Sequence, residues 1–266
     1  MLDIQSMDFI DKTEIKKRAN SIFTKNGSPE TSDKYAHIST EKIIDDMELL
    51  GWKVSDAKQV RARKGVGFQK HLVVFRNPEL YIQGVDGDDV FPQILLTNSH
   101  DGKNAFTFTA GLFRMVCENG LVVSSQEFDN LKIRHYGYDF DELEKTINAI
   151  VEKLPLTVDS MNRFKETQLD QKQMLDFAKK ALNTRFTEDE LKIIKVDLND
   201  LISPTRVEDK GSDLWSVFNT VQEKLTHGMF TYGYATKTRK ARKIKNFNKD
   251  MELNTKLYKL ANEFAN

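Results

Sequence analysis

The feature that most constrains the fold of this chain is a change in the spacing of its apolar residues. Between residues 52 and 133 they alternate or form short runs, as in "GFQKHLVVF" (67–75), "FPQILLT" (91–97) and "AFTFTAGLFRMVC" (105–117). This spacing is typical of β-strands. The stretches "VDGDD", "SHDGKN" and "ENG" separate the runs, and Asp-Gly and Asn-Gly readily adopt the positive φ of a hairpin turn. We therefore predict an antiparallel β-meander.

Helical spacing surrounds this region. Ile43, Ile44, Met47 and Leu50 follow a capping candidate, Ser39. The helical pattern returns from Asp141 onward, and we expect Pro155 to interrupt it. The predicted class is α+β, with an antiparallel β-meander core flanked by helices and a mainly helical C-terminal half. We expect an N-terminal arm and linker over 1–33, a helix and sheet core over 34–138, and a helical region over 139–266. The last region is expected to pack on the sheet as one compact unit with the core.

Composition narrows the class of protein further. The 266 residues include 39% hydrophobic ones, which is enough to bury a core, and 40 Lys and Arg balance 40 Asp and Glu. The single cysteine excludes an intramolecular disulfide and any multi-cysteine zinc or iron–sulfur site within one chain. No apolar run approaches the roughly 18–20 residues that cross a bilayer, and the first residues lack a secretory pattern. We expect a cytoplasmic protein without a membrane partner.

The positive charge is concentrated in two blocks. Residues 53–76 hold seven cations against one acid, Asp56, and residues 237–245 hold six cations and no acid. Phe230, Tyr232 and Tyr234 precede the second block. Cations neutralise phosphates and release counterions, and aromatic rings stack on unpaired bases. The pattern favours a surface for single-stranded nucleic acid, and the alternative is an ordinary solvated charge run.

Thirteen residues are candidates for nucleic-acid contacts. Arg114, inside a predicted strand, pairs either with a phosphate or with a carboxylate such as Asp101 or Glu118. The candidates are Arg61, Arg63, Lys64, Lys70, Arg76, Arg114, Tyr232, Tyr234, Lys237, Arg239, Lys240, Arg242 and Lys243.

The sequence predicts no catalytic residue, metal site or cofactor. Ser99, His100 and Asp101 are adjacent, whereas a catalytic triad is assembled from separated positions, so we interpret them as a turn. The five histidines lack the spacing of known metal motifs. Cys117, in an apolar run, is expected in the core. The stretch "RKGVGF" (63–68) lacks the phosphate-binding loop pattern, so nucleotide hydrolysis has no support.

Four stretches carry a family resemblance: "YAHISTEKIIDDMELLGW", "GFQKHLVVFRNPEL", "LLTNSHDGKNAFTFTAGLFRMVCENGLVV" and "RVEDKGSDLWSVFNTVQEKLTHG". They resemble the successive signatures of domain of unknown function family 932, also described as phage/plasmid-like protein, over about residues 34–265. The resemblance implies a role in mobile elements of a bacterial host but no activity. Its signature includes His71, Arg76, Asn98, Arg114, Arg206, Trp215, Asn219, Gln222 and Glu223.

Three functions remain open at this point. The leading hypothesis is a phage- or plasmid-type nucleic-acid-binding protein, not an enzyme, that favours single-stranded DNA and assists annealing or recombination. The second is a protein-interaction module without catalysis, either a counter-defence factor that binds a host protein or an assembly subunit. The third is a metal-dependent nuclease that uses His71, His100 or Asp101. The sequence leaves the oligomeric state open.

Overall fold

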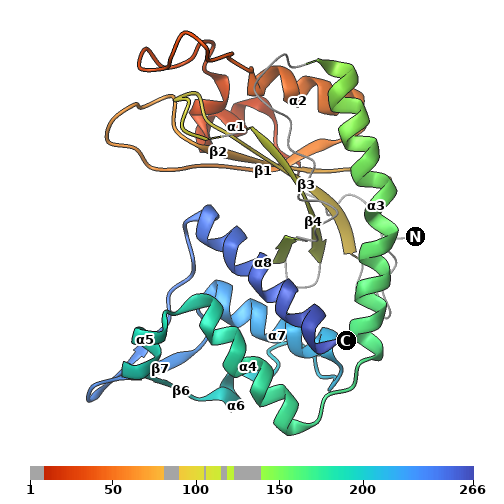
Figure 1. Cartoon of the computed structure of the whole chain (residues 1–266), viewed down its shortest axis with the longest axis vertical. Helices are drawn as coiled ribbons and strands as arrows, with labels where there is room; N and C mark the ends of the chain where they lie inside the picture. Colours follow the sequence, from red (N-terminus) through yellow and green to blue (C-terminus); the bar gives the residue numbers. More distant parts are fainter. Residues whose placement is uncertain (1–8, 81–89, 105, 115–118, 123–138) are drawn as a thin grey trace. The chain divides into compact units, whose positions relative to one another are not determined.

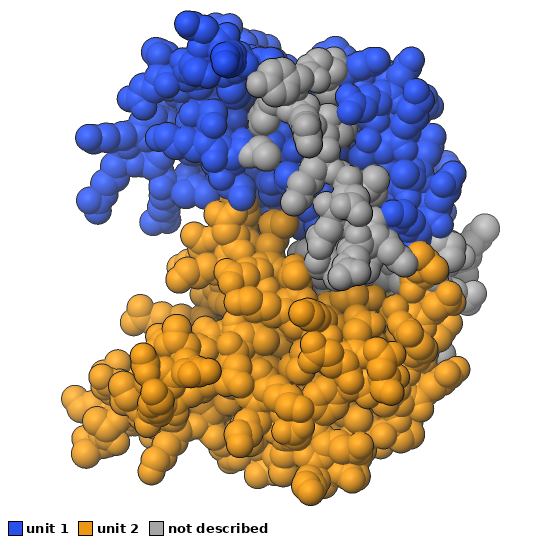
Figure 2. All heavy atoms as spheres, in the orientation of Figure 1, with its two compact units in different colours: residues 1–83, 89–113, 124–154 blue, residues 84–88, 114–123, 155–266 orange. Residues whose placement is uncertain are grey.

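The structure is a computed structural model that describes residues 9–80, 90–104, 106–114, 119–122 and 139–266 (Figure 1). The chain divides into two compact units, coloured separately in Figure 2. Unit 1 comprises residues 1–83, 89–113 and 124–154, and unit 2 comprises residues 84–88, 114–123 and 155–266. The sequence led us to expect one compact unit with a boundary at residue 138. The main division falls later, inside a helix.

Unit 1 is built on an antiparallel sheet. Its strands are β1 (Lys53–Gln59), β2 (His71–Arg76), β3 (Val90–Asn98) and β4 (Thr107–Arg114), adjacent in that order. β2 pairs antiparallel with β1 and with β3, and His71 lies opposite both Gln59 and Asn98. All residues of β3 and residues 71–75 of β2 are buried, so both faces of these strands are covered. With flanking helices and a mainly helical C-terminal half, the predicted α+β class is confirmed.

The helices α1 (Lys12–Arg18), η2 (Asn20–Phe23) and α2 (Thr40–Leu49) belong to unit 1. Ser39 caps α2 through its side chain, which accepts a hydrogen bond from the Lys42 amide. Ile15, Ala19 and Ile22 are fully buried. The segment 1–33, expected as an arm, therefore supplies part of the core of unit 1.

Helix α3 (Phe140–Glu166) contains the main division of the chain, which falls before Pro155. The sequence predicted that Pro155 would interrupt the helix, and this prediction is wrong. A proline removes one backbone hydrogen bond from a helix interior. Here the helix continues, with apolar residues buried before the proline and after it, including Ile147 and Phe164. The break comes after Glu166, where Asp170 and Gln173 form the capping box of the next helix.

In unit 2 three helices pack around a fourth. The central helix, α7 (Leu214–His227), contacts α4 (Gln171–Arg185), α6 (Leu198–Ile202) and α8 (Phe247–Phe264). Residues 214–226 are all buried, so α7 has no solvated face. A strand, β5 (Asn119–Val122), contacts α8.

Unit 2 also holds a second sheet, which the sequence did not predict. Helix α5 (Glu188–Ile193) leads into β6 (Ile194–Val196), and β7 (Thr231–Tyr234) and β8 (Lys237–Lys240) complete the sheet in the order β6-β7-β8. Both pairings are antiparallel. The second basic block therefore starts on a β-hairpin. Within the described ranges, no helix has both the length and the apolar character needed to cross a bilayer.

Gly228 joins the central helix to this hairpin. It ends α7 with φ +70°, a left-handed conformation that favours glycine. A Cβ on Gly228 would lie 2.5 Å from the carbonyl carbon of Arg242 and 2.8 Å from that of Ala241. Two backbone hydrogen bonds flank this contact, from Ala241 to Phe230 and from Ile244 to Thr226, each 2.9 Å long. The end of the hairpin is therefore held against the end of a buried helix.

We expect Gly228→Ala to lower the free energy of unfolding by more than about 2 kcal/mol, because the positive φ and the backbone clash both oppose a Cβ. Gly65→Ala is the matched control, since Gly65 has φ +65° and nothing within 4 Å of the added Cβ. The control should lower the free energy of unfolding only by the penalty for a positive φ, about 1 kcal/mol. Urea unfolding of both variants measures the difference, and equal losses would contradict the contact.

Candidate nucleic-acid interface

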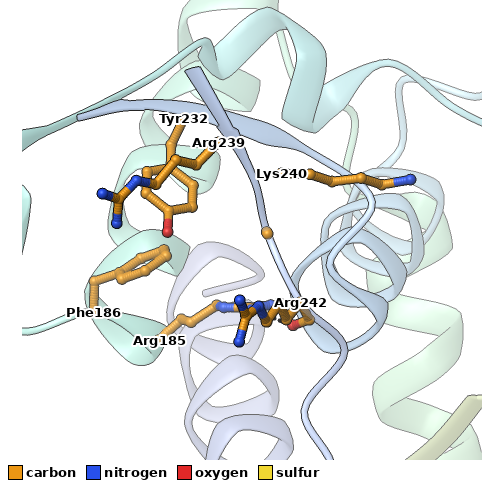
Figure 3. Close-up of a pocket in the computed structure, with 7 residues that line it drawn as sticks. Arg185, Phe186, Tyr232, Arg239, Lys240 and Arg242 are labelled. Atoms are coloured by element: carbon orange, nitrogen blue, oxygen red, sulfur yellow. Dashed lines mark hydrogen bonds between the residues drawn. The ribbon is translucent and has the colours of Figure 1, made fainter. Parts of the chain in front are cut away.

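The β7–β8 hairpin separates its side chains between two faces. Tyr232 lies opposite Arg239 and Tyr234 lies opposite Lys237, so these four project from one face of the sheet. Lys240, one position along, projects from the other face. Figure 3 shows this split, with Tyr232 beside Arg239 and Lys240 directed away from them. The structure thus brings four of the predicted residues together as an aromatic and cationic face.

The rings and cations on this face are in contact. The guanidinium carbon of Arg239 lies 4.5 Å from the centroid of the Tyr234 ring, within cation–π range. Tyr234 is 38% exposed, and Lys237 and Arg239 are also exposed. Among the described residues no ion pair links Lys237, Arg239, Lys240, Arg242 or Lys243 to a carboxylate. Their charge is available to an outside anion.

A pocket of about 650 Å³ lies beside this face (Figure 3). Two of its lining residues, Arg185 and Phe186, come from the end of helix α4, and the others from the hairpin and the two residues that follow it. The lining contains four cationic residues, two aromatic residues and no acid. It comprises Arg185, Phe186, Tyr232, Arg239, Lys240, Ala241 and Arg242.

Arg185 is held firmly at this pocket. One terminal nitrogen, Nη2, donates a 2.6 Å hydrogen bond to the backbone carbonyl of Arg242. Its guanidinium carbon lies 5.6 Å from the Phe186 ring centroid and 5.3 Å from that of Phe230. The other terminal nitrogen, Nη1, is buried and has no hydrogen-bond partner. Burial lowers the pKa of Arg185, while the neighbouring Tyr232 acts to raise it.

Sequence reasoning missed Arg185 and Phe186. In the sequence they stand directly before the capping box of Thr187 and Glu190, more than fifty positions before Arg242. An Arg-Phe pair at the end of a helix is a weak signal by itself. Only the packing of α4 near the hairpin shows that it shares a pocket with the second basic block.

The first basic block forms a separate surface on unit 1. The loop between β1 and β2 extends from the sheet (orange in Figure 1) and carries Arg61, Arg63 and Lys64, all exposed. Val66 beside them is 70% exposed. No ion pair to these three cations is found in the described ranges, whereas Lys58 pairs with Asp56 at 2.9 Å. Three of the five predicted residues in this block therefore lie together at one loop.

Two other predicted residues of this block are less exposed than the three loop cations. Lys70 is half-buried, and burial lowers its pKa. Arg76 is also half-buried, at the end of the central strand β2. Arg114 ends β4, and its side chain and Cys117 lie outside the described residues. The two basic blocks belong to different units.

Ser99, His100 and Asp101 form a turn, as predicted. Ser99 Oγ donates directly to Asp101 Oδ1 at 2.7 Å, and the same carboxylate oxygen accepts from the Lys103 amide at 3.1 Å. The His100 ring instead lies against His37 and His71, with centroids 4.6 and 5.1 Å apart. The order needed for a triad, serine to histidine to acid, is absent here. In the described part of the chain no group of three His, Cys, Asp or Glu side chains is placed to hold a metal ion.

His71 joins the sheet to helix α2. Its Nδ1 lies 3.2 Å from the carbonyl oxygen of Gln69 and 3.1 Å from Ser21 Oγ. Because the carbonyl can only accept, we assign the proton to Nδ1. Nε2 then accepts from Thr40 Oγ1 at 2.9 Å, and Thr40 Oγ1 accepts from Asn98 Nδ2 at 3.0 Å. Burial lowers the pKa of His71 to about 4. This chain of hydrogen bonds requires the neutral imidazole, so two signature residues, His71 and Asn98, have a structural role.

The signature residues on α7 are also paired within unit 2. Arg206 Nη2 donates to Glu223 Oε1 at 2.6 Å, and Thr205 Oγ1 donates to Glu223 Oε2 at 2.7 Å. Burial acts to raise the pKa of Glu223, but these hydrogen bonds lower it overall. Gln222 Nε2 donates to Asn254 Oδ1 at 2.6 Å. These buried polar groups attach α7 to its neighbours and leave little capacity for a ligand.

The chain resembles proteins whose activity is not stated in their names. The family model described as "Domain of unknown function (DUF932)" matches residues 30–258. The chain is 27% identical to the UPF0380 protein YafZ of Escherichia coli (strain K12) over 256 residues, which covers 94% of this chain and 89% of YafZ. It is 28% identical over 259 residues to the UPF0380 protein YfjQ of the same strain, with the same coverage. No solved structure matches the chain.

We expect unit 1 to lose stability as the pH falls from about 6.5 to about 4. The unfolded chain binds a proton at His71 near pH 6.5, and the folded chain only near pH 4. The contribution of His71 to the free energy of unfolding is therefore fully present above pH 6.5. It is lost as the pH falls toward 4, by about 3 kcal/mol in total. The measurement is urea unfolding followed by Trp52 fluorescence in a Trp215→Phe background, which leaves one tryptophan, buried in unit 1.

His71→Gln should reduce this pH dependence between pH 5 and 6.5, above the range in which most carboxylates titrate. The part that remains comes from His37, whose pKa burial also lowers. The matched control is His227→Gln in unit 2, where burial and Lys243 lower the pKa of a half-buried histidine. The control should leave the transition reported by Trp52 unchanged. Equal slopes in the parent protein and in His71→Gln would disprove the assignment.

Proposed function

The chain belongs to the DUF932 family, and from that premise we propose that it binds nucleic acid, favours single-stranded DNA and assists annealing or recombination in mobile elements. The observation that carries the proposal is the aromatic and cationic face of the β7–β8 hairpin with its acid-free pocket. Cations neutralise phosphates, and exposed rings stack on bases that a duplex would keep paired.

A second observation supports the same function. Unit 1 has its own exposed cationic loop, with Arg61, Arg63 and Lys64 free of ion pairs within the described ranges. The chain has equal numbers of acidic and basic residues, so a surface with cations and no acids means that acids outnumber cations elsewhere. Several described lysines outside the two surfaces are indeed paired, such as Lys12 with Asp45 at 2.5 Å. The exposed cations of the loop and of the hairpin have no such partner within the described ranges, so a polyanion can reach them.

The hairpin is tested by reversing Arg239, Lys240, Arg242 and Lys243 to Glu. We expect at least about a 100-fold loss of affinity for a labelled oligo-dT strand, because several phosphate contacts are lost together. For the parent protein the logarithm of affinity should fall linearly with the logarithm of salt, by about 0.7 for each phosphate neutralised. Fluorescence anisotropy from about 50 to about 200 mM NaCl, with a duplex for comparison, measures both effects.

The matched control reverses four exposed lysines elsewhere in unit 2, Lys172, Lys179, Lys210 and Lys259, with the same change in net charge. It should keep binding within a few-fold of the parent. Absent or salt-insensitive binding would overturn the proposal. A stoichiometric host protein recovered despite nuclease treatment would then favour the interaction module. Cleavage with Mg²⁺ that is lost in His100→Ala would favour a nuclease.

The loop on unit 1 is tested separately. Changing Arg61, Arg63 and Lys64 to Glu should weaken binding of the same strand by about tenfold and reduce the salt slope, because fewer phosphates are neutralised. The control changes Lys34, Lys103 and Lys145, three exposed lysines of unit 1, to Glu. If both triple variants lose the same affinity, the loop has no particular role.

A further inference from the structure

The pocket beside the hairpin has the size and chemistry of a site for one nucleotide. Its volume of about 650 Å³ lies within the range of small-molecule sites, roughly 300–1,000 Å³. Three arginines from two separate segments of unit 2 line it, Arg185, Arg239 and Arg242. Arginine presents a planar fork that matches two oxygens of a phosphate, which a lysine cannot do.

The free donor at Arg185 points to an anion. Nη2 is used by the Arg242 carbonyl, which fixes the plane of the guanidinium, while the buried Nη1 has no partner. A buried donor without a hydrogen bond is unfavourable, so the guanidinium gains a hydrogen bond if it turns Nη1 toward a ligand oxygen in the pocket. In Figure 3 the side chains of Arg185, Phe186, Tyr232 and Arg239 are grouped, and the Tyr232 hydroxyl is directed toward Phe186 and Arg185.

The aromatic lining completes the recognition. The Phe186 and Tyr232 rings have centroids 6.1 Å apart and planes inclined by 60°, so they form an angled wall and do not fill the space between them. A base can stack on one such ring while its phosphate meets the arginines. Sugar, base and phosphate would together use the polar and the apolar parts of the lining.

We propose that this pocket binds a single nucleoside 5′-phosphate unit, with the phosphate on Arg185, Arg239 and Arg242 and the base on Tyr232 or Phe186. This inference rests on the proposed function when the unit is part of a DNA strand. The same chemistry is offered by a free mononucleotide. Arg185 is the anchor of the site, because it is the one of the three arginines that is half-buried beside two rings and held by a backbone carbonyl.

The test titrates dTMP, thymidine and inorganic phosphate separately into the full-length protein by calorimetry. We expect saturable binding of dTMP and at least about tenfold weaker binding of the other two, because each lacks one half of the recognition. Arg185→Gln should weaken dTMP by about tenfold or more, and Arg185→Lys should recover only part of the loss. Lys179→Gln is the control on helix α4, since Lys179 is exposed and does not line the pocket, and it should bind dTMP as the parent does.

Arg239→Gln keeps the test decisive if Arg185→Gln does not fold, because Arg239 is exposed and no helix depends on it. Equal binding of dTMP and thymidine, or parental dTMP affinity in both arginine variants, would overturn the pocket. If dTMP does not bind but oligo-dT does, the pocket proposal is wrong and nucleic-acid binding stands. If dTMP binds through the arginines and oligo-dT does not, the pocket serves a free nucleotide and the proposed function is wrong.

Discussion

The contact between Gly228 and the backbone of Ala241 and Arg242 is the constraint on which the functional surface of unit 2 depends. It joins the end of a helix that is buried on every side to the end of a hairpin that is exposed on every residue of β8. The same short segment supplies the carbonyl that orients Arg185. A buried core thus positions exposed, charged side chains without the core itself carrying any part of the surface chemistry.

The sequence predicts the fold class well and the site only in part. Alternating apolar residues and the Asp101-Gly102 turn predict the sheet of unit 1, because those signals are local. The second sheet is not predictable in this way, since β8 is a four-residue strand of cations and has the composition of a solvated run. Helix α7 looks amphipathic in sequence, yet Glu223 and Gln222 are buried because Arg206 and Asn254 pair with them. Such pairing depends on tertiary contacts.

The signature residues divide into two groups by what they contact. His71 and Asn98 form hydrogen bonds inside unit 1, and Arg206 and Glu223 form one inside unit 2. Their polar groups therefore stabilise the fold. The residues proposed for binding are mostly exposed cations in loops and at a sheet edge. Polar character in a sequence motif is thus no guide to a ligand site unless burial and partners are known.

The position of β8 at the edge of its sheet has a consequence for self-association. An edge strand presents unpaired backbone N–H and C=O groups to which another strand can add, and cationic side chains oppose such pairing through repulsion. Lys237, Arg239 and Lys240 make this edge repel a second copy of itself. A polyanion that neutralises these side chains also removes the repulsion. The same positive charge that would attract a nucleic-acid strand therefore keeps unbound protein molecules apart.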